Sequence, residues 1–372
     1  MKLGMFMQPV HKTERDVHRT LLEDVEIGVH CGAVGMDEFW VGEHYTNKTQ
    51  NVTSAAVFLA NLIARTDKML LGAGVVPMPA ANPGYVAAQM ALLDHLSAGR
   101  LIVGLGIGAC PTDFEMYKAV ELYPMLKEGV RQTIALWTQP QAPFHVSGEY
   151  WDFAVGEERR WPEYGIGEML EPYQKPHPPV AIPCISPNSE SVRFAGENGF
   201  IPITAQLNPA WIVTDHWKCY GEGSARTGRT PDPANWRVAR AIYIGETDAA
   251  AEDFVNDEDG PFDFYYRYGT DVIKGAGYAK IIVPEPEMVD TQAQDDYGWR
   301  EYKRDNLMYG SPDTVLEKLL AFCQAVPPFG TLLMTSFEYG GARDKIRDSI
   351  SLMANEVMPR LRYALGERAA GQ

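Results

Sequence analysis

Short apolar segments alternate with longer segments of helical periodicity along most of the chain. Eight short segments are predicted to be strands: residues 3–7, 38–43, 69–76, 101–106, 180–185, 200–204, 238–244 and 331–335. Strands buried on both faces are continuously apolar, and strands that alternate with helices pair in parallel. Eight such units predict an α/β fold in which residues 1–372 form a single domain, a (β/α)₈ TIM barrel with insertions.

Residues that start and stop helices fall between these strands. Asn82 and Pro83 form a start signal, and the apolar face that follows ends at Gly99. Near the end of the chain, apolar residues at helical spacing run to Val357, and Pro359 is expected to close that helix. A doubly wound open sheet is disfavoured because the first strand is followed by QPVH rather than by a glycine-rich phosphate loop.

Three segments depart from the simple alternation. Residues 144–153 are predicted to form a hairpin that turns near Ser147 and Gly148, and residues 154–179 to form a surface loop. Residues 256–305, which begin with an acidic run, are predicted to form a long irregular loop. A loop of that length is usually a mobile lid over a binding site, and the alternative is a solvated insertion with no catalytic role.

Composition narrows the class of protein. The 33 Lys and Arg against 49 Asp and Glu give a net charge of −16, which argues against binding to nucleic acid. No apolar run approaches about 18 residues and the first residues do not resemble a secretion signal, so we expect a cytoplasmic protein with no membrane partner. The five cysteines are dispersed, which predicts no disulfide framework. Asp113 and Glu115 have no histidine at ligand spacing, so no metal site is expected.

In a barrel of this kind, functional residues lie at the C-terminal ends of the strands. His44 follows the second strand and is a candidate general acid or hydrogen-bond donor to a developing anion, and a structural role is the alternative. Its neighbour Glu43 should face the other way. The small residues 72–74 would let a flat ligand approach the backbone. The alternating glycines from Gly104 to Gly108 lack the dinucleotide spacing and could equally serve barrel packing.

The segment after the fifth predicted strand carries Ser186, Asn188 and Ser189 where a helix should begin. The start of a helix offers unpaired N–H groups and a partial positive charge, which suits a phosphate group. Ordinary capping of the helix by Ser or Asn is the alternative. Neutral aromatic residues near the strand ends would suit an apolar substrate, or they belong to the core: Phe6, Tyr45, Phe114, Trp151 and Phe337.

These segments, taken in order, resemble the bacterial luciferase-like family of flavin-dependent monooxygenases. The matching segments are KLGMF, WVGEHYT, GAGVVPMPAANP, LLDHLSAGRLIVGLGIG, SPNSESVRFAGENG, YGSPDTVLEKL, TSFEYGG and NEVMPRLR, and they run almost from end to end. Residues at the barrel mouth are more similar to the terpenoid-ketone oxygenases of that family, such as diketocamphane and limonene monooxygenases. Luciferase itself has an arginine that contacts phosphate where this sequence has Ile107.

The resemblance implies the oxygenase component of a two-component system. Such an enzyme receives reduced FMN from a separate flavin reductase and forms a flavin hydroperoxide with oxygen. It then inserts one oxygen atom into a small, mostly apolar molecule such as a cyclic ketone or a terpenoid. The resemblance also implies a homodimer formed through helices at about 53–65 and 83–98. Two alternatives stay open: a deazaflavin-dependent oxidoreductase that transfers hydride, and a catalytically silent flavin-binding protein.

The same resemblance implies roles for individual residues. His44 would lie at the reacting edge of the flavin, and the bond between Gly74 and Val75 would be a cis peptide under the isoalloxazine ring. The other cofactor contacts would be Gly106, Ile107, Ser186, Pro187, Asn188 and Ser189, the last four at the phosphate. Apart from the resemblance, we expect the substrate to contact Phe6, Tyr45, Phe114, Gln206 and Phe337.

Overall fold

The computed structural model describes residues 1–139, 141–337 and 340–366. The chain divides into two compact units, the first holding Met1–Trp40, Lys48–Asn51 and Ile182–Gln372 and the second holding Val41–Asn47 and Val52–Ala181. Strands β2 (Glu38–Val41) and β7 (Val180–Cys184) contribute residues to both units.

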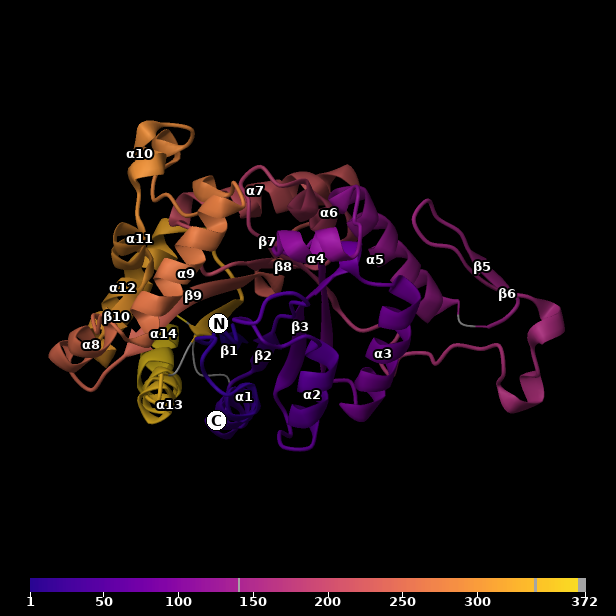
Figure 1. Cartoon of the computed structure of the whole chain (residues 1–372), viewed down its shortest axis with the longest axis horizontal. Helices are drawn as coiled ribbons and strands as arrows, with labels where there is room; N and C mark the ends of the chain where they lie inside the picture. The colour runs from indigo at the N-terminus through magenta and orange to yellow at the C-terminus, as the bar shows by residue number, and fades with distance from the viewer. Residues whose placement is uncertain (140, 338–339, 367–372) are drawn as a thin grey trace. The chain divides into compact units, whose positions relative to one another are not determined.

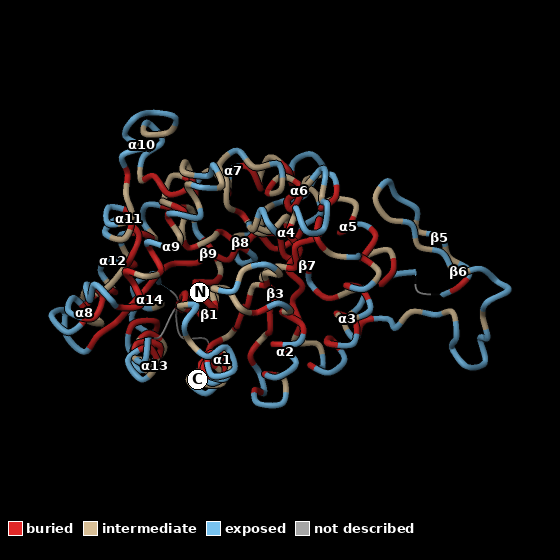
Figure 2. Tube along the Cα trace, in the orientation of Figure 1, coloured by how far each residue is buried: buried red, intermediate tan, exposed pale blue. Residues whose placement is uncertain are grey.

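The first unit is built on parallel strands. β1 (Lys2–Met7) pairs with β11 (Thr331–Ser336), and β11 pairs with β9 (Arg237–Ile244). β9 also pairs with β8 (Ile201–Thr204) and with the short β10 (Met308–Gly310). The helices are α1 (Val17–Ala33), α6 (Glu190–Asn198), α7 (Ala210–Arg226), α8 (Asp248–Val255), α9 (Pro261–Gly275), α10 (Gln292–Asp296), α11 (Trp299–Asn306), α12 (Pro312–Ala325), α13 (Arg343–Leu352) and α14 (Met358–Ala364). The long strands are buried, whereas the helices expose their outer faces (Figures 1 and 2).

The second unit contains the parallel pair β3 (Leu70–Pro77) and β4 (Leu101–Gly106), and β4 pairs in turn with Val180 and Ala181 of β7. Its helices are α2 (Ala55–Ile63), α3 (Pro83–Leu96), α4 (Pro111–Met116) and α5 (Leu122–Thr138). A two-stranded antiparallel hairpin, β5 (Phe144–Val146) and β6 (Phe153–Val155), is inserted after α5 (Figure 1).

The strands pair in the order β10-β9-β11-β1-β2-β3-β4-β7-β8, and β8 pairs again with β9. The chain therefore has the predicted α/β TIM-barrel fold, a closed barrel of eight parallel strands with helices between them. All eight predicted strands are present, with ends shifted by two residues or fewer. Within the described ranges, no helix is long and apolar enough to cross a membrane.

The start and stop signals predicted for α3 are confirmed. Asn82 caps the helix, because its Oδ1 accepts a hydrogen bond from the N–H of Tyr85 at 3.0 Å. The chain leaves the helix through Gly99, whose φ of +82° lies in the left-handed region that glycine adopts without steric cost. The pattern of apolar residues between these signals is therefore the core-facing side of a real helix.

The prediction that Pro359 closes the last helix is wrong. α13 runs into a π-helical turn (Met353–Val357), and α14 then continues to Ala364 with Pro359 in its first turn. A proline is tolerated in the first turn of a helix because the N–H group that it lacks would have no partner within the helix. The π-helical turn therefore lets the helical path continue past a residue that ends an ordinary helix.

The prediction of a long irregular loop over residues 256–305 is also wrong. Most of this segment is helical, in α9, α10 and α11. Phe262, Tyr265 and Tyr266 recur at helical spacing on α9 and are buried, and Tyr302 of α11 packs edge-on against Tyr266 with ring centroids 5.1 Å apart. The charged and proline-rich residues around this aromatic stripe concealed its helical periodicity, so composition gave the wrong structure.

The predicted hairpin is confirmed, but its turn is longer than expected. Residues 147–152 connect the two strands, where the sequence suggested a turn at residues 147–148. The carboxylate of Glu128 on α5 accepts hydrogen bonds from the N–H groups of Glu149, Tyr150 and Trp151 at 2.8, 2.8 and 3.0 Å. One side chain from outside the hairpin therefore shapes its turn, and local sequence could not reveal this.

A buried ion pair joins the strands of the first unit. Arg237 on β9 donates from Nη2 to Oε1 of Glu38 on β2 at 2.7 Å, and their side chains are 7% and 0% exposed. The indole N–H of Trp40 donates to the other carboxylate oxygen at 3.0 Å, and Arg237 also donates to the carbonyl oxygen of Asn235 at 2.7 Å. These bonds compensate for the loss of water around both charges.

Candidate active site

Glu43 and His44 leave β2 for different surroundings, as predicted. The carboxylate of Glu43 is buried and accepts hydrogen bonds from Tyr45 Oη and from the N–H of Ala55, both at 2.7 Å. Burial raises the pKa of this carboxyl. His44 is 18% exposed, and its Nδ1 lies 3.9 Å from Oδ2 of Asp113. Glu43 therefore anchors the start of α2, whereas the imidazole of His44 stays accessible.

Asp113, in the first turn of α4, holds the loop that carries His44. Its Oδ1 accepts hydrogen bonds from the N–H and the hydroxyl of Thr46 at 2.8 and 2.5 Å and from the N–H of Tyr45 at 3.2 Å. These donors fix the carboxylate with Oδ2 toward His44. Tyr45, a predicted substrate contact, packs its ring edge-on against Tyr117 with centroids 5.2 Å apart.

The thiol of Cys110 completes a cluster that the sequence did not reveal. Its Sγ lies 3.2 Å from Oγ1 of Thr112, 3.7 Å from Oγ1 of Thr46 and within 4.8 Å of a ring nitrogen of His44. These contacts, the one with His44 first, lower the pKa of the thiol to about 7. Donor atoms of His44, Cys110 and Asp113 all lie within 4.8 Å of one another. His44 therefore lies close to Asp113 in space, although no histidine lies at ligand spacing from Asp113 along the chain.

The peptide bond between Gly74 and Val75 is cis, as the resemblance implied. β3 changes register against β4 between Ala73 and Val76. Gly104 on β4 has no space for a side chain, because a Cβ there would lie 2.1 Å from the carbonyl oxygen of Ala73. This contact supports barrel packing as the role of Gly104.

Gly106 and Ile107 lie where β4 passes into the loop before α4. Gly106 is the last residue of β4 and pairs with Pro77 of β3. Gly108, with a φ of +90°, bends the chain, and Ile107 and Phe114 are half-buried. The second unit thus places these candidates in the segment that also carries Cys110 and Asp113, and their contacts with a cofactor or substrate stay predictions.

The predicted phosphate turn lies in the first unit, at the start of α6. Ser189 caps this helix, because its Oγ accepts from the N–H of Val192 at 3.4 Å. Asn188 has a φ of +52°, and its N–H donates to Oδ2 of Asp215 at 2.5 Å. Arg193 donates to Oδ1 of Asn188 at 2.7 Å. Capping is thus confirmed, and a phosphate role is compatible with it, because a helix start keeps further N–H groups without helical partners.

A chain of hydrogen bonds fixes the backbone of this turn. The indole N–H of Trp236 donates to Oγ1 of Thr204 at 3.0 Å, and Thr204 lies 3.2 Å from Nδ1 of His216. His216 Nε2 lies 3.0 Å from the carbonyl oxygen of Ser186, which can only accept. The proton of the neutral imidazole is therefore on Nε2, and Nδ1 accepts from Thr204. Burial lowers the pKa of His216 to about 4.

This depressed pKa predicts a loss of stability in acid. The folded state favours the neutral form of His216. The neutral imidazole therefore contributes to the free energy of unfolding above pH 6.5, and this contribution is lost as the pH falls towards 4. We expect the protonation of His216 to remove about 2 kcal/mol of the free energy of unfolding between pH 7 and pH 5. His216→Gln keeps a donor and an acceptor but does not titrate, so its urea-unfolding free energy should fall less over this range.

The matched control for His216 is His145→Gln, on the exposed hairpin. It should keep the pH dependence of the wild-type protein. A His216→Gln variant that loses stability with acid as steeply as the wild type would contradict the assignment.

Two further substrate candidates contact one aromatic residue of α9. Gln206 is buried and donates from Nε2 to Tyr265 Oη at 2.8 Å, and Phe337 stacks on the Tyr265 ring with centroids 3.6 Å apart. Asn306 Nδ2 donates to the carbonyl oxygen of Gln206 at 2.8 Å. Phe6 is half-buried near the end of β1. The structure thus brings Gln206 and Phe337 together through α9, which lies in the segment predicted to be a loop.

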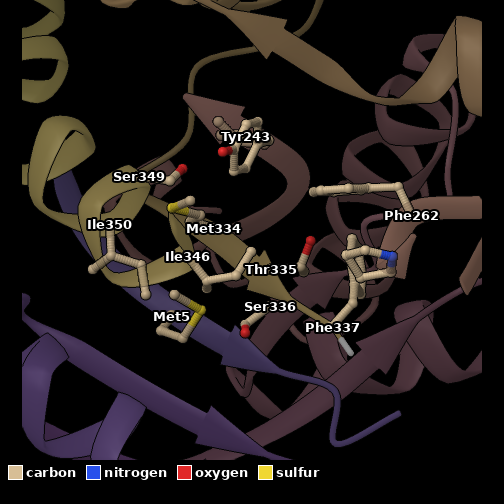
Figure 3. Close-up of a pocket in the computed structure, with 12 residues that line it drawn as sticks. Met5, Tyr243, Phe262, Met334, Thr335, Ser336, Phe337, Ile346, Ser349 and Ile350 are labelled. Atoms are coloured by element: carbon tan, nitrogen blue, oxygen red, sulfur yellow. The ribbon is translucent and has the colours of Figure 1, made fainter. Parts of the chain in front are cut away.

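A small apolar pocket lies beside Phe337. It is lined by Met5 of β1, by Met334 of β11, by Phe262 at the start of α9 and by Ile350 of α13 (Figure 3). Ser349 also lines it, and its hydroxyl oxygen accepts from the N–H of Ile244 on β9 at 2.8 Å. The pocket lies between the sheet and α13, so we interpret it as a packing void of the core rather than as a substrate site.

The fold places the chain among the TIM-barrel proteins. The sequence model of the luciferase-like monooxygenase family matches residues 1–327. The chain therefore belongs to the luciferase-like monooxygenase family, and it is an enzyme of the monooxygenase class.

Individual relatives agree with this assignment. 3,6-diketocamphane 1,6-monooxygenase of Pseudomonas putida is 26% identical, over 97% of this chain and 98% of the relative. A solved structure, the oxygenating constituent of 3,6-diketocamphane monooxygenase from Pseudomonas putida in complex with FMN, is described as a type II Baeyer-Villiger monooxygenase. It superimposes with a TM-score of 0.82 and 26% identity, covering 96% of this chain and 98% of that one. An F420-dependent secondary alcohol dehydrogenase shares the fold at 16% identity, with a TM-score of 0.68 and coverage of 97% and 99%.

Proposed function

We propose that this chain is the oxygenase component of a two-component monooxygenase. It would take reduced FMN from a separate flavin reductase and use oxygen to insert one oxygen atom into a small, mostly apolar substrate, with a cyclic ketone or terpenoid as the favoured class. The observation that carries the proposal is the end-to-end similarity to the FMN-bound oxygenating constituent of a diketocamphane monooxygenase. The accessible imidazole of His44 supports it.

Each of the candidate residues would have its own role in holding the cofactor. Gly74 and Val75 would lie under the isoalloxazine ring, and Gly106 and Ile107 would also contact the cofactor. The imidazole of His44 would donate a proton or a hydrogen bond at the reacting edge of the ring. The turn of Ser186, Pro187, Asn188 and Ser189 would bind the phosphate. Reduced FMN would supply the electrons that activate oxygen. The candidate contacts for the substrate remain Phe6, Tyr45, Phe114, Gln206 and Phe337. The rings of Tyr45 and Phe337 also pack against other aromatic side chains.

The test is turnover under air with reduced FMN supplied by an added flavin reductase. A panel of bicyclic ketones and terpenoids should yield products that carry one oxygen atom from labelled dioxygen. The alternative is hydride transfer to or from a deazaflavin, which we keep because an F420-dependent dehydrogenase shares the fold. Anaerobic turnover with a deazaflavin, and none with reduced FMN and oxygen, would replace the proposal by this alternative.

The phosphate role of the turn predicts a selective effect of Ser189→Asp. Aspartate also caps helices well, so α6 should remain folded. The added carboxylate would repel a phosphate dianion, and we expect the affinity for FMN to fall at least about 10-fold, because a hydrogen bond to a charged group contributes about 1.5–3 kcal/mol. Riboflavin, which lacks the phosphate, is the matched ligand and should bind as before. Equal losses of affinity for FMN and riboflavin, measured by fluorescence titration under anaerobic conditions, would show that this turn does not bind the phosphate.

A homodimer through α2 and α3 is part of the proposal. Val57 of α2 and Tyr85, Leu92 and Leu96 of α3 are large apolar side chains that are exposed in the single chain. The three on α3 recur at helical spacing and form one stripe, which is typical of a surface that a partner covers. Leu92→Glu should raise the dimer dissociation constant at least about 10-fold in light scattering. Leu22→Glu, at an exposed apolar residue of α1, should leave the assembly unchanged.

The dimer test has a clear negative outcome. A wild-type protein that is monomeric at all concentrations, or a Leu92→Glu variant that stays dimeric, would exclude the α2–α3 surface.

A further inference from the structure

We propose that His44, Cys110 and Asp113 form a binding site for a borderline-soft divalent cation of the Zn²⁺ type. One imidazole nitrogen, one thiol sulfur and one carboxylate oxygen come within 4.8 Å of one another in the second unit. The three residues come from the loop after β2, the loop after β4 and the first turn of α4.

The spacing of the donor atoms suits a single ion. Zinc binds nitrogen and oxygen at about 2.0–2.2 Å and sulfur at about 2.3 Å, so two ligands of one tetrahedral ion lie roughly 3–4 Å apart. His44 Nδ1 and Asp113 Oδ2 are already 3.9 Å apart. Since every pair lies within 4.8 Å, a closure of about one ångström would complete the set. We expect rotations of the Cys110 and His44 side chains to provide this closure.

The carboxylate is already oriented for such a role. Three donors, from the N–H and the hydroxyl of Thr46 and the N–H of Tyr45, hold Oδ1 of Asp113. Oδ2 therefore faces His44 without an ordering cost on binding. The Asp113 side chain is 2% exposed, whereas His44 and Cys110 are partly exposed. An ion would thus arrive from the solvent side and meet a buried, fixed carboxylate.

The chemistry of the donors selects the type of ion. A set of imidazole, thiolate and carboxylate matches Zn²⁺ and other late divalent ions, whereas Mg²⁺ and Ca²⁺ prefer oxygen ligands throughout. Three protein ligands leave a fourth tetrahedral position for water, as in zinc sites that are not purely structural. The cluster therefore predicts a site that binds Zn²⁺ and Co²⁺ but does not bind Mg²⁺.

An ion bound here would occupy the imidazole of His44. This consequence rests on the proposed function, in which that imidazole acts at the flavin, and it would make Zn²⁺ an inhibitor. The binding of the ion does not rest on the proposed function. The experiment below therefore measures binding alone and can fail or succeed independently of any monooxygenase activity.

The test is a Co²⁺ titration of the full chain, kept reduced with a phosphine. A bound thiolate gives a near-ultraviolet charge-transfer band, which we expect to saturate at one ion per chain and to disappear when Zn²⁺ is added. Calorimetry with Zn²⁺ should give a dissociation constant of about 10 μM or below, and Mg²⁺ should give no heat of binding. Cys110→Ser should abolish the band and weaken Zn²⁺ at least about 10-fold, and His44→Ala should weaken it similarly.

The matched control is Cys323→Ser, at the other partly exposed cysteine, on α12. It should leave the band and the affinity unchanged. Cys110→Ala serves as a second variant if Cys110→Ser melts at a lower temperature than the wild type. A wild-type chain without the thiolate band at one equivalent of Co²⁺, or a band that survives the loss of Cys110, would overturn the proposal.

Discussion

Replacing His44 by alanine is expected to lower product formation by about 10²–10⁴-fold, the usual contribution of a positioned acid–base group. The imidazole is partly exposed at the end of β2 and is held beside a buried carboxylate, with Nδ1 3.9 Å from Asp113 Oδ2. Under the proposed function it acts at the reacting edge of the flavin, which the variant should still bind. Oxygen would then be consumed without transfer to the substrate.

The measurement compares oxygen uptake, hydrogen peroxide release and product in the same reaction with reduced FMN. For His44→Ala we expect uptake to continue, peroxide to account for nearly all of it, and the dissociation constant for reduced FMN to change little. His145→Ala is the matched control, because His145 also pairs with an aspartate, Asp152 at 2.7 Å, but on the exposed hairpin. If His44→Ala keeps the wild-type rate and yield, His44 has a structural role only.

Glu38→Gln is expected to lower the free energy of unfolding by about 3–5 kcal/mol. The substitution leaves the Arg237 guanidinium buried without its carboxylate, and the remaining contact with the carbonyl oxygen of Asn235 cannot neutralise its charge. Urea unfolding at neutral pH would measure the loss. A double replacement of Glu38 and Arg237 by leucine should cost less than the single change, because no unpaired charge stays in the core.

The matched control for this pair is Glu197→Gln. Glu197 accepts from Nη1 of Arg226 at the same distance, 2.7 Å, but both side chains are in contact with solvent. Solvent-exposed ion pairs contribute little, so this variant should unfold as the wild type does. Equal losses for Glu38→Gln and Glu197→Gln would show that burial does not determine the contribution of the Glu38–Arg237 pair.

The strands could be predicted from sequence because strands buried on both faces appear as short apolar runs. The order of those runs, alternating with helices, then limits the topology to a few arrangements. The errors occurred where the decisive contacts are distant in sequence or where polar residues dilute the pattern. On α9, buried Tyr265 and Tyr266 sit among charged neighbours, so the helix looked like an acidic loop. In the hairpin, Glu128 shapes a turn about 20 residues further along the chain.

The candidate site was predicted only in part for a related reason. His44 and the turn near Ser189 follow the C-terminal ends of strands. They could be selected because functional residues of a TIM barrel lie at these ends. The cluster of His44 with Cys110 and Asp113 depends on which two loops meet, which no spacing along the chain encodes. The hydrogen-bond chain through His216 was missed likewise, because its members come from β8, α7 and the residue before β9.

The close approach of β3 and β4 at Gly104 sets a limit for anyone who would redesign this barrel. A Cβ at this position would lie 2.1 Å from the carbonyl oxygen of Ala73 and 3.0 Å from the side chain of Val75. In a saturation library scored for folding, position 104 should therefore accept glycine alone, whereas half-buried Ile107, three residues further on, should accept many side chains without loss of the fold. Substitutions intended to vary the barrel mouth are best introduced in the loop after Gly106, and the residues within β4 are best left unchanged.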